Sequence, residues 1–145
     1  MIFPDWGSTG TQSAAENLPL YTEWAVDWAR NAFALRNGRP YTVSGDEALR
    51  IWVRCALHPD SRRFLYSAHS ADYGNELAEC MARGGDQNIL EALLRRELQE
   101  TLLVSPYIRQ VDGFTFARRG QQMTVGFRVQ TVYDGFTTET EVNIP

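Results

Sequence analysis

The order of the predicted elements indicates an α+β fold: an N-terminal strand pair, about three helices and a C-terminal three-stranded antiparallel meander. Three observations predict it. Polar and apolar residues alternate near the start of the chain, ahead of an Asn-Gly pair. Helical spacing dominates the middle, and alternation returns after Ile108. Strands and helices that are segregated along the chain are typical of α+β domains.

The length of 145 residues suits one domain. Residues 1–19 are rich in Gly, Ser, Thr and Pro and show no period, which predicts a flexible or partner-ordered N-terminal arm. We therefore expect a single domain over residues 20–145.

A half-buried strand is predicted over residues 22–28, where apolar and acidic positions alternate. Its apolar face would contain three residues: Trp24, Val26 and Trp28. Asn37-Gly38 then predicts a tight hairpin turn, because both residues accept positive φ angles. The returning segment contains Pro40, which has no amide hydrogen to donate, so it is expected at a sheet edge.

Three helices are predicted next. Residues 44–47 have the pattern of a capping box with Ser44 as the cap, and Pro59 should stop this helix by His58. A second helix is expected over residues 74–83, ahead of two glycines. Asp86 is the expected cap of the third. Its apolar stripe is assigned to Leu90, Leu94, Glu97 or Leu98, and Leu102. Its solvent-facing side, the wet side, is assigned to Arg95, Arg96, Glu97 and Glu100.

The meander begins with a strand over residues 108–117, which turns at Arg119-Gly120. The next strand has alternate apolar residues: Met123, Val125, Phe127 and Val129. The last strand is expected to place Thr138, Thr140, Val142 and Ile144 on one face and Glu139, Glu141 and Asn143 on the other. One packed and one wet face are typical of such a sheet. Residues 137–144 would form an uncovered edge, which is a template for a strand from another chain.

Composition excludes several classes of function. The chain has 18 acidic and 14 basic residues, a net charge of −4, which disfavours a dedicated nucleic-acid binder. Its longest purely apolar run, residues 32–35, is far shorter than the roughly 20 residues of a membrane-spanning helix. No secretory signal is recognisable at the N-terminus, so we expect a soluble chain made in the cytoplasm.

Catalytic and metal-binding patterns are weak. Neither His58 nor His69 has an evident catalytic partner beyond Asp60, and Cys55 and Cys80 lack metal-ligand spacing, so no metal and no cofactor are predicted. Glu97 and Glu100 are the best pair of carboxylates for a glycoside hydrolase. The adjacent arginines favour a solvated helix face instead, and no catalytic residue is assigned.

Aromatic residues point to protein partners. Trp6 lies in the arm, where it has no local core, so we expect it to dock on a partner. For Trp24 and Trp28, core packing and partner binding both remain open. The candidate partner-binding residues are therefore Trp6, Trp24, Trp28, Thr138, Thr140, Val142 and Ile144.

Several segments resemble a known family. They are EWAVDW at residues 23–28, the Asn37-Gly38 turn, EALRIW at 47–52, RRFLYS at 62–67, DYGNEL at 72–77, and LVSPYI at 103–108. In this order they resemble the baseplate wedge and sheath-initiator proteins of contractile phage tails, the "lysozyme-like" wedge proteins, and especially the branch found in PBSX-type prophage tails. Many members have Glu-Pro-Arg-Ile where this chain has Ser105-Pro106-Tyr107-Ile108, so the resemblance does not extend to any wedge contacts that those charges make in other members.

The resemblance implies a structural baseplate protein, not an enzyme, that nucleates the sheath of a contractile tail or related injection machine by strand addition. It implies six copies in the assembled baseplate of a virion or phage-tail-like particle. The implied partners are baseplate wedge proteins and sheath subunits, with tube or hub proteins as further candidates. Two alternatives remain: another tail protein without sheath contact, and a peptidoglycan hydrolase.

Overall fold

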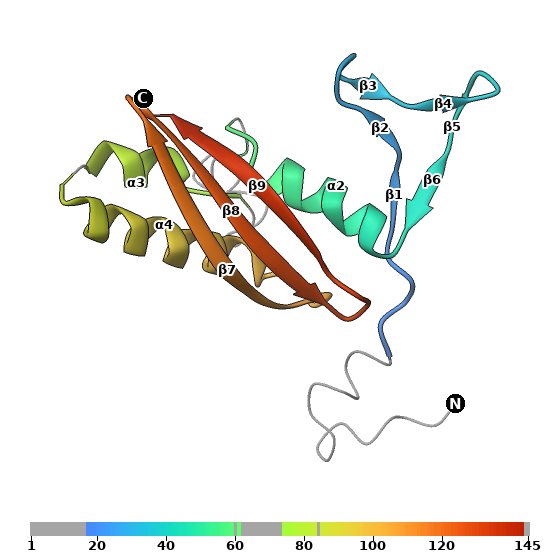
Figure 1. Cartoon of the computed structure of the whole chain (residues 1–145). Helices are drawn as coiled ribbons and strands as arrows, with labels where there is room; N and C mark the ends of the chain where they lie inside the picture. Colours follow the sequence, from blue (N-terminus) through green and yellow to red (C-terminus); the bar gives the residue numbers. More distant parts are fainter. Residues whose placement is uncertain (1–16, 60, 62–73, 84, 144–145) are drawn as a thin grey trace. The chain divides into compact units, whose positions relative to one another are not determined.

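The computed structural model describes residues 17–59, 61, 74–83 and 85–143 (Figure 1). The chain divides into two compact units, Met1–Ile51 and Trp52–Pro145. The three described helices and the strands around them confirm the predicted α+β class. None of these helices is long and apolar enough to cross a membrane.

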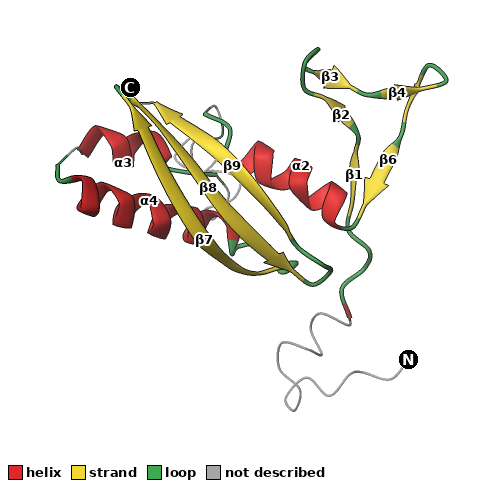
Figure 2. Cartoon of the chain, viewed as in Figure 1, coloured by secondary structure: helices red, strands yellow, loops and turns green. Residues whose placement is uncertain are grey.

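The first unit contains a ribbon of short antiparallel ladders (Figure 2). The pairs are β1 (Thr22–Trp24) with β6 (Thr42–Ser44), β2 (Val26–Asp27) with β3 (Ala32–Phe33), and β4 (Leu35–Arg36) with β5 (Arg39–Pro40). The predicted strand over residues 22–28 is thus divided at Ala25. There the Ala25 amide donates to Tyr41 O at 2.8 Å, and the Ala25 carbonyl accepts from Ala34 N at 2.9 Å. Ala25 thus bonds to two different segments of the ribbon.

The Asn37-Gly38 turn is confirmed. It joins β4 to β5, and both residues have positive φ, 53° and 77°, as the two-residue hairpin turn requires. Pro40 pairs with Leu35 in this two-stranded ladder, so it lies on an edge strand as predicted.

Helix α2 (Asp46–Ala56) begins one residue later than the capping box predicted. Ser44 is the last residue of β6 and pairs with Thr22. The Gly45 carbonyl accepts the first helical hydrogen bond from Leu49 N at 3.0 Å, so Gly45 occupies the cap position. The helix ends before His58, as Pro59 predicted.

The second unit is a two-layer structure. The sheet has the order β7 (Ile108–Arg119), β8 (Gln122–Thr131), β9 (Phe136–Asn143). Helices α3 (Leu77–Arg83) and α4 (Gln87–Leu102) lie side by side on one face, with α3 against β9 and α4 against β7 (Figure 1). The core between the layers contains Leu77, Met81, Leu90, Leu94, Leu98, Leu102, Val111, Met123, Val125, Val129 and Val142.

Helix α4 follows its predicted stripe with one correction. Asp86 caps it by accepting from Asn88 N at 3.0 Å, and the four leucines of the stripe are buried. Glu97, which was assigned both to the stripe and to the wet side, is also buried, with 5% of its surface exposed, so its wet-side assignment was wrong and its stripe assignment is confirmed. Its carboxylate accepts from Glu76 N at 2.8 Å and from the Thr101 hydroxyl at 2.9 Å, which compensates its burial.

Helix α3 begins at Leu77, three residues after the predicted start at Gly74. Asn75 prevents an earlier start. Its side-chain oxygen accepts from Leu77 N at 3.2 Å, and its amide nitrogen lies within hydrogen-bond distance of the carbonyls of Ala56, His58 and Ser61. These contacts connect the end of α2 to the start of α3.

Candidate assembly interface

Strand β9 is a regular edge strand of the C-terminal sheet. Its eight residues pair with β8 in unbroken register, from Val129 opposite Phe136 to Gln122 opposite Asn143. Among the described residues, no strand pairs with the other side of β9. The outward backbone groups over residues 138–143 therefore form a row suited to pairing with a further strand.

The opposite edge, β7, is irregular. Its register with β8 shifts twice, between Ile108 and Gln110 and between Asp112 and Thr115. Gly113, inside the second shift, has a φ of 65°. Bulges of this kind twist an edge away from flat pairing and are a usual protection against unwanted strand addition. Of the two edges, β9 is thus the better template.

Side chains of β9 alternate as predicted. Phe136 and Val142 are buried on the helix-covered inner face, and Thr138 and Thr140 are half-buried there. The outer-face residues are exposed: Thr137, Glu139, Glu141 and Asn143. A strand added at this edge would lie beside the backbone of β9 and meet only the margins of the Thr138, Thr140 and Val142 side chains. Ile144 lies outside the described residues.

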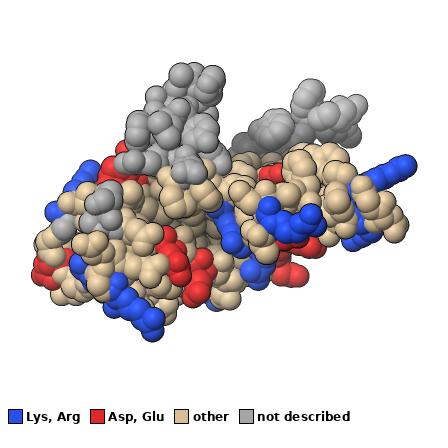
Figure 3. All heavy atoms as spheres, turned by 90° about the horizontal axis from the view of Figure 1, so that it is seen from above, with Lys and Arg blue, Asp and Glu red and all other residues tan. Residues whose placement is uncertain are grey.

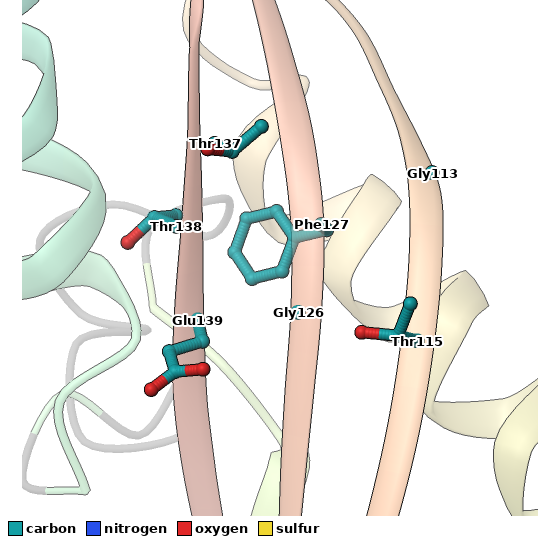
Figure 4. A pocket seen from close by; sticks show the side chains of 7 residues that line it. All are labelled: Gly113, Thr115, Gly126, Phe127, Thr137, Thr138 and Glu139. Carbon is teal, nitrogen blue, oxygen red and sulfur yellow. The ribbon is translucent and has the colours of Figure 1, made fainter.

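The outer face has an open hollow beside β9 (Figure 4). Gly126 is at its centre, with Thr115 opposite on β7 and Glu139 opposite on β9. A Cβ at Gly126 would lie 2.6 Å from the Thr115 hydroxyl oxygen, so a larger residue would have to displace that side chain. The hollow leaves Glu139 without a side chain facing it from β8.

An ion pair crosses the same face between β8 and β7. Arg128 donates through Nε and Nη2 to the two oxygens of Asp112, at 2.9 and 3.0 Å, and Gln130 donates to the same carboxylate at 2.7 Å. The Arg128 hydrogen bond lowers the pKa of Asp112 below its usual value. The contacts direct the guanidinium of Arg128 toward β7, away from β9.

This lowered pKa predicts a pH dependence of stability. A carboxylate with a lowered folded-state pKa stabilises the fold above about pH 4, and that contribution is lost as the pH falls through the folded pKa. We expect Asp112→Asn to melt at a lower temperature than the wild type at neutral pH, with the difference closing as the pH falls through the lowered folded-state pKa of Asp112. Melting temperatures of both proteins across this range test it; a difference that does not change with pH would contradict it.

The N-terminal ribbon exposes aromatic surface. Trp24 is 50% and Phe33 56% exposed, and their rings are tilted against each other at 6.2 Å. Leu20 and Leu35 are exposed as well. Trp28, by contrast, is half-buried. Trp6 lies outside the described residues. The two described tryptophan candidates thus differ, and Trp24 presents more surface to a partner.

Among the described residues, the thiol and carboxylates that were considered for chemistry have the following surroundings. Burial raises the pKa of the Cys80 thiol to about 11, which keeps it protonated at neutral pH. Glu100 binds Arg96 at 2.9 Å, and Glu97 holds the start of α3, so each carboxylate has a local partner. Across the described residues no group of three or more metal-ligating side chains is positioned to hold an ion. His69 and Asp60 lie outside the described residues.

Surface charge is mixed on the face shown in Figure 3, where acidic and basic side chains occur in small interspersed groups. It is consistent with the net charge of −4.

A match to a protein-family model identifies the family of this chain. No curated protein matches the chain. The family model described as contractile injection system sheath initiator matches residues 22–134, which include both the ribbon and the sheet up to the turn before β9. Since the match spans most of the chain, this protein belongs to the sheath-initiator family of contractile injection systems.

Proposed function

We propose that this protein nucleates the sheath of a contractile tail or tail-like injection machine by offering β9 as the template for a strand of the first sheath subunits. The observation that carries this proposal is the regular outer side of β9 over residues 138–143, with which no strand of the described residues pairs, in a sheet whose other edge is bulged. Main-chain hydrogen bonds would supply affinity, and the alternating side chains would set the register.

The expected setting is the baseplate. Six copies would surround the tube in a virion or phage-tail-like particle made in a bacterial cytoplasm, with sheath subunits on one side and wedge proteins on the other. Tube or hub proteins are further candidate partners. The exposed pair Trp24 and Phe33 supports a role of the ribbon in holding wedge proteins, since a two-stranded ribbon has little core of its own. Trp6, in the proposed arm of residues 1–19, would add to that contact.

A purely structural role, without catalysis, is part of the proposal. The local partners of Glu97 and Glu100 support it. A peptidoglycan hydrolase would instead release soluble fragments from purified cell walls. A tail protein without sheath contact would assemble equally well with any β9 variant that still folds.

Proline substitution along β9 tests strand addition. In an antiparallel pair, successive residues direct their backbone groups to opposite sides, so Glu139→Pro and Glu141→Pro test one side and Thr140→Pro the other. On the partner side, proline removes a free donor and is tolerated, whereas on the β8 side it breaks the ladder. We expect at least one variant to fold, to join the baseplate and to yield particles with a tube but no sheath in electron micrographs.

Matched substitutions on β7 are the control. Ala117→Pro and Arg118→Pro lie in the regularly paired end of β7 and sample both sides of that edge, and particles with the variant that folds should still assemble a sheath. If every folded β9 variant still assembled full-length sheath, β9 would not be the template.

A further inference from the structure

Two carboxylates lie on the outer face of β9, at the open edge of the sheet. Glu139 and Glu141 are exposed, two residues apart on β9, and therefore on the same face. Glu141 accepts from the Gln122 amide at 2.9 Å. Within the described part of the chain, the carboxylate of Glu139 has no hydrogen bond or ion pair.

The register explains why Glu139 has no partner on its own sheet. The residue opposite it on β8 is Gly126, which has no side chain. Its diagonal neighbour on β8 is Arg128, which pairs with Thr137 across the ladder, but that guanidinium binds Asp112 on β7. The charge of Glu139 is thus uncompensated on the β8 side, and its other side faces the position of an added strand.

We propose that the strand that adds to β9 places a basic side chain, Arg or Lys, on its outer face beside Glu139, and that this ion pair sets its register. The inference rests on the proposed strand addition at β9. Opposite charges in directly opposed cross-strand positions stabilise a sheet, and like charges destabilise it. A one-residue slip would move the basic side chain to the inner face, away from Glu139.

The inner face defines the rest of the pattern. Thr138 and Thr140 are only half-buried at the margin of the core, beside buried Val142. A neighbouring strand with apolar or β-branched residues on its inner face would cover them and extend the core. The partner strand is therefore expected to alternate apolar inner residues with polar outer residues, of which one is basic beside Glu139.

Charge variants test this partner chemistry. The probe is the purified sheath subunit of the same particle, with its affinity for the full-length initiator measured at low and at high salt. We expect Glu139→Gln to weaken binding about two- to fivefold, and Glu139→Arg to weaken it about tenfold or more because like charges then meet. The wild-type affinity should fall with salt, and that dependence should be smaller in Glu139→Gln. Glu100→Arg, the same reversal on the exposed side of α4, is the matched control and should leave affinity unchanged.

A charge swap completes the test. Each basic residue in the strands of the sheath subunit is changed singly to Glu, and one of these changes should restore binding to Glu139→Arg. A merely structural effect of residue 139 would not be rescued in this way. If the β9 proline variants abolish binding while Glu139→Arg binds normally, or no swap rescues it, the ion pair is refuted and strand addition stands. If the proline variants bind normally, strand addition itself fails.

Discussion

Replacing Asn75 with aspartate, a residue of nearly the same shape, is expected to lower the free energy of unfolding by about 3–5 kcal/mol. Asn75 is 2% exposed, and its amide nitrogen lies 2.8–3.1 Å from the carbonyls of Ala56, His58 and Ser61. A carboxylate cannot donate to these carbonyls and would place a negative charge among their oxygens. The contacts between the end of α2 and the start of α3 would then be lost. Chemical denaturation at neutral pH measures the resulting fall in the free energy of unfolding.

Acid provides a second readout for the same variant. The surrounding carbonyls should raise the pKa of an aspartate at this position, so its neutral form, which can donate one hydrogen bond, becomes favoured as the pH falls. Asn75→Asp should therefore recover part of its lost stability toward about pH 4, where the wild type gains none from this site. Equal stability of Asn75→Asp and the wild type at neutral pH would refute the assigned role.

Replacing Glu97 with leucine should be the second large effect, about 2–4 kcal/mol. The Glu97 carboxylate accepts from Glu76 N, at the start of α3, and from the Thr101 hydroxyl, and Thr101 is 1% exposed. Leucine fills similar space but removes the carboxylate that accepts both of these hydrogen bonds. Negative charge near the N-terminus of a helix is also favourable, and that contribution would be lost.

Two further variants isolate this effect. Glu97→Gln retains an acceptor oxygen and should lose about 1 kcal/mol. Glu100→Gln removes only an exposed contact with Arg96, and its melting temperature should stay close to that of the wild type. Melting temperatures in the order Glu100→Gln, Glu97→Gln, Glu97→Leu, from highest to lowest, are expected, and a neutral Glu97→Leu would contradict the structural role of this carboxylate.

Features decided by near neighbours could be predicted from the sequence. The Asn37-Gly38 turn follows from the φ angles that these two residues accept, and Asp86 caps α4 through an amide two residues away. Burial on alternate positions of β8 and β9 follows from the pleat, since one face meets the helices and the other does not. The sheet, its strand order and the buried face of each strand could therefore be predicted from the alternation of apolar and polar residues.

Other features were decided only by the tertiary structure. Glu97 looked like a wet-side residue because its sequence neighbours are charged, yet its acceptor role depends on an amide 21 residues away. Asn75 likewise binds carbonyls 14 to 19 residues away. Periodicity carries no information about such pairs, because the same side chain is stable in water or in the core according to whether a partner is supplied.

The edge of the sheet shows both contributions. The alternation of β9 and its strand-forming residues were visible in the sequence. The bulges in β7, and the position of Gly126 opposite Glu139, could be recognised only from the register of the three strands. Sequence periodicity determines which face of a strand is apolar, whereas pairing between distant segments determines which edge stays open and which charge is left without a partner.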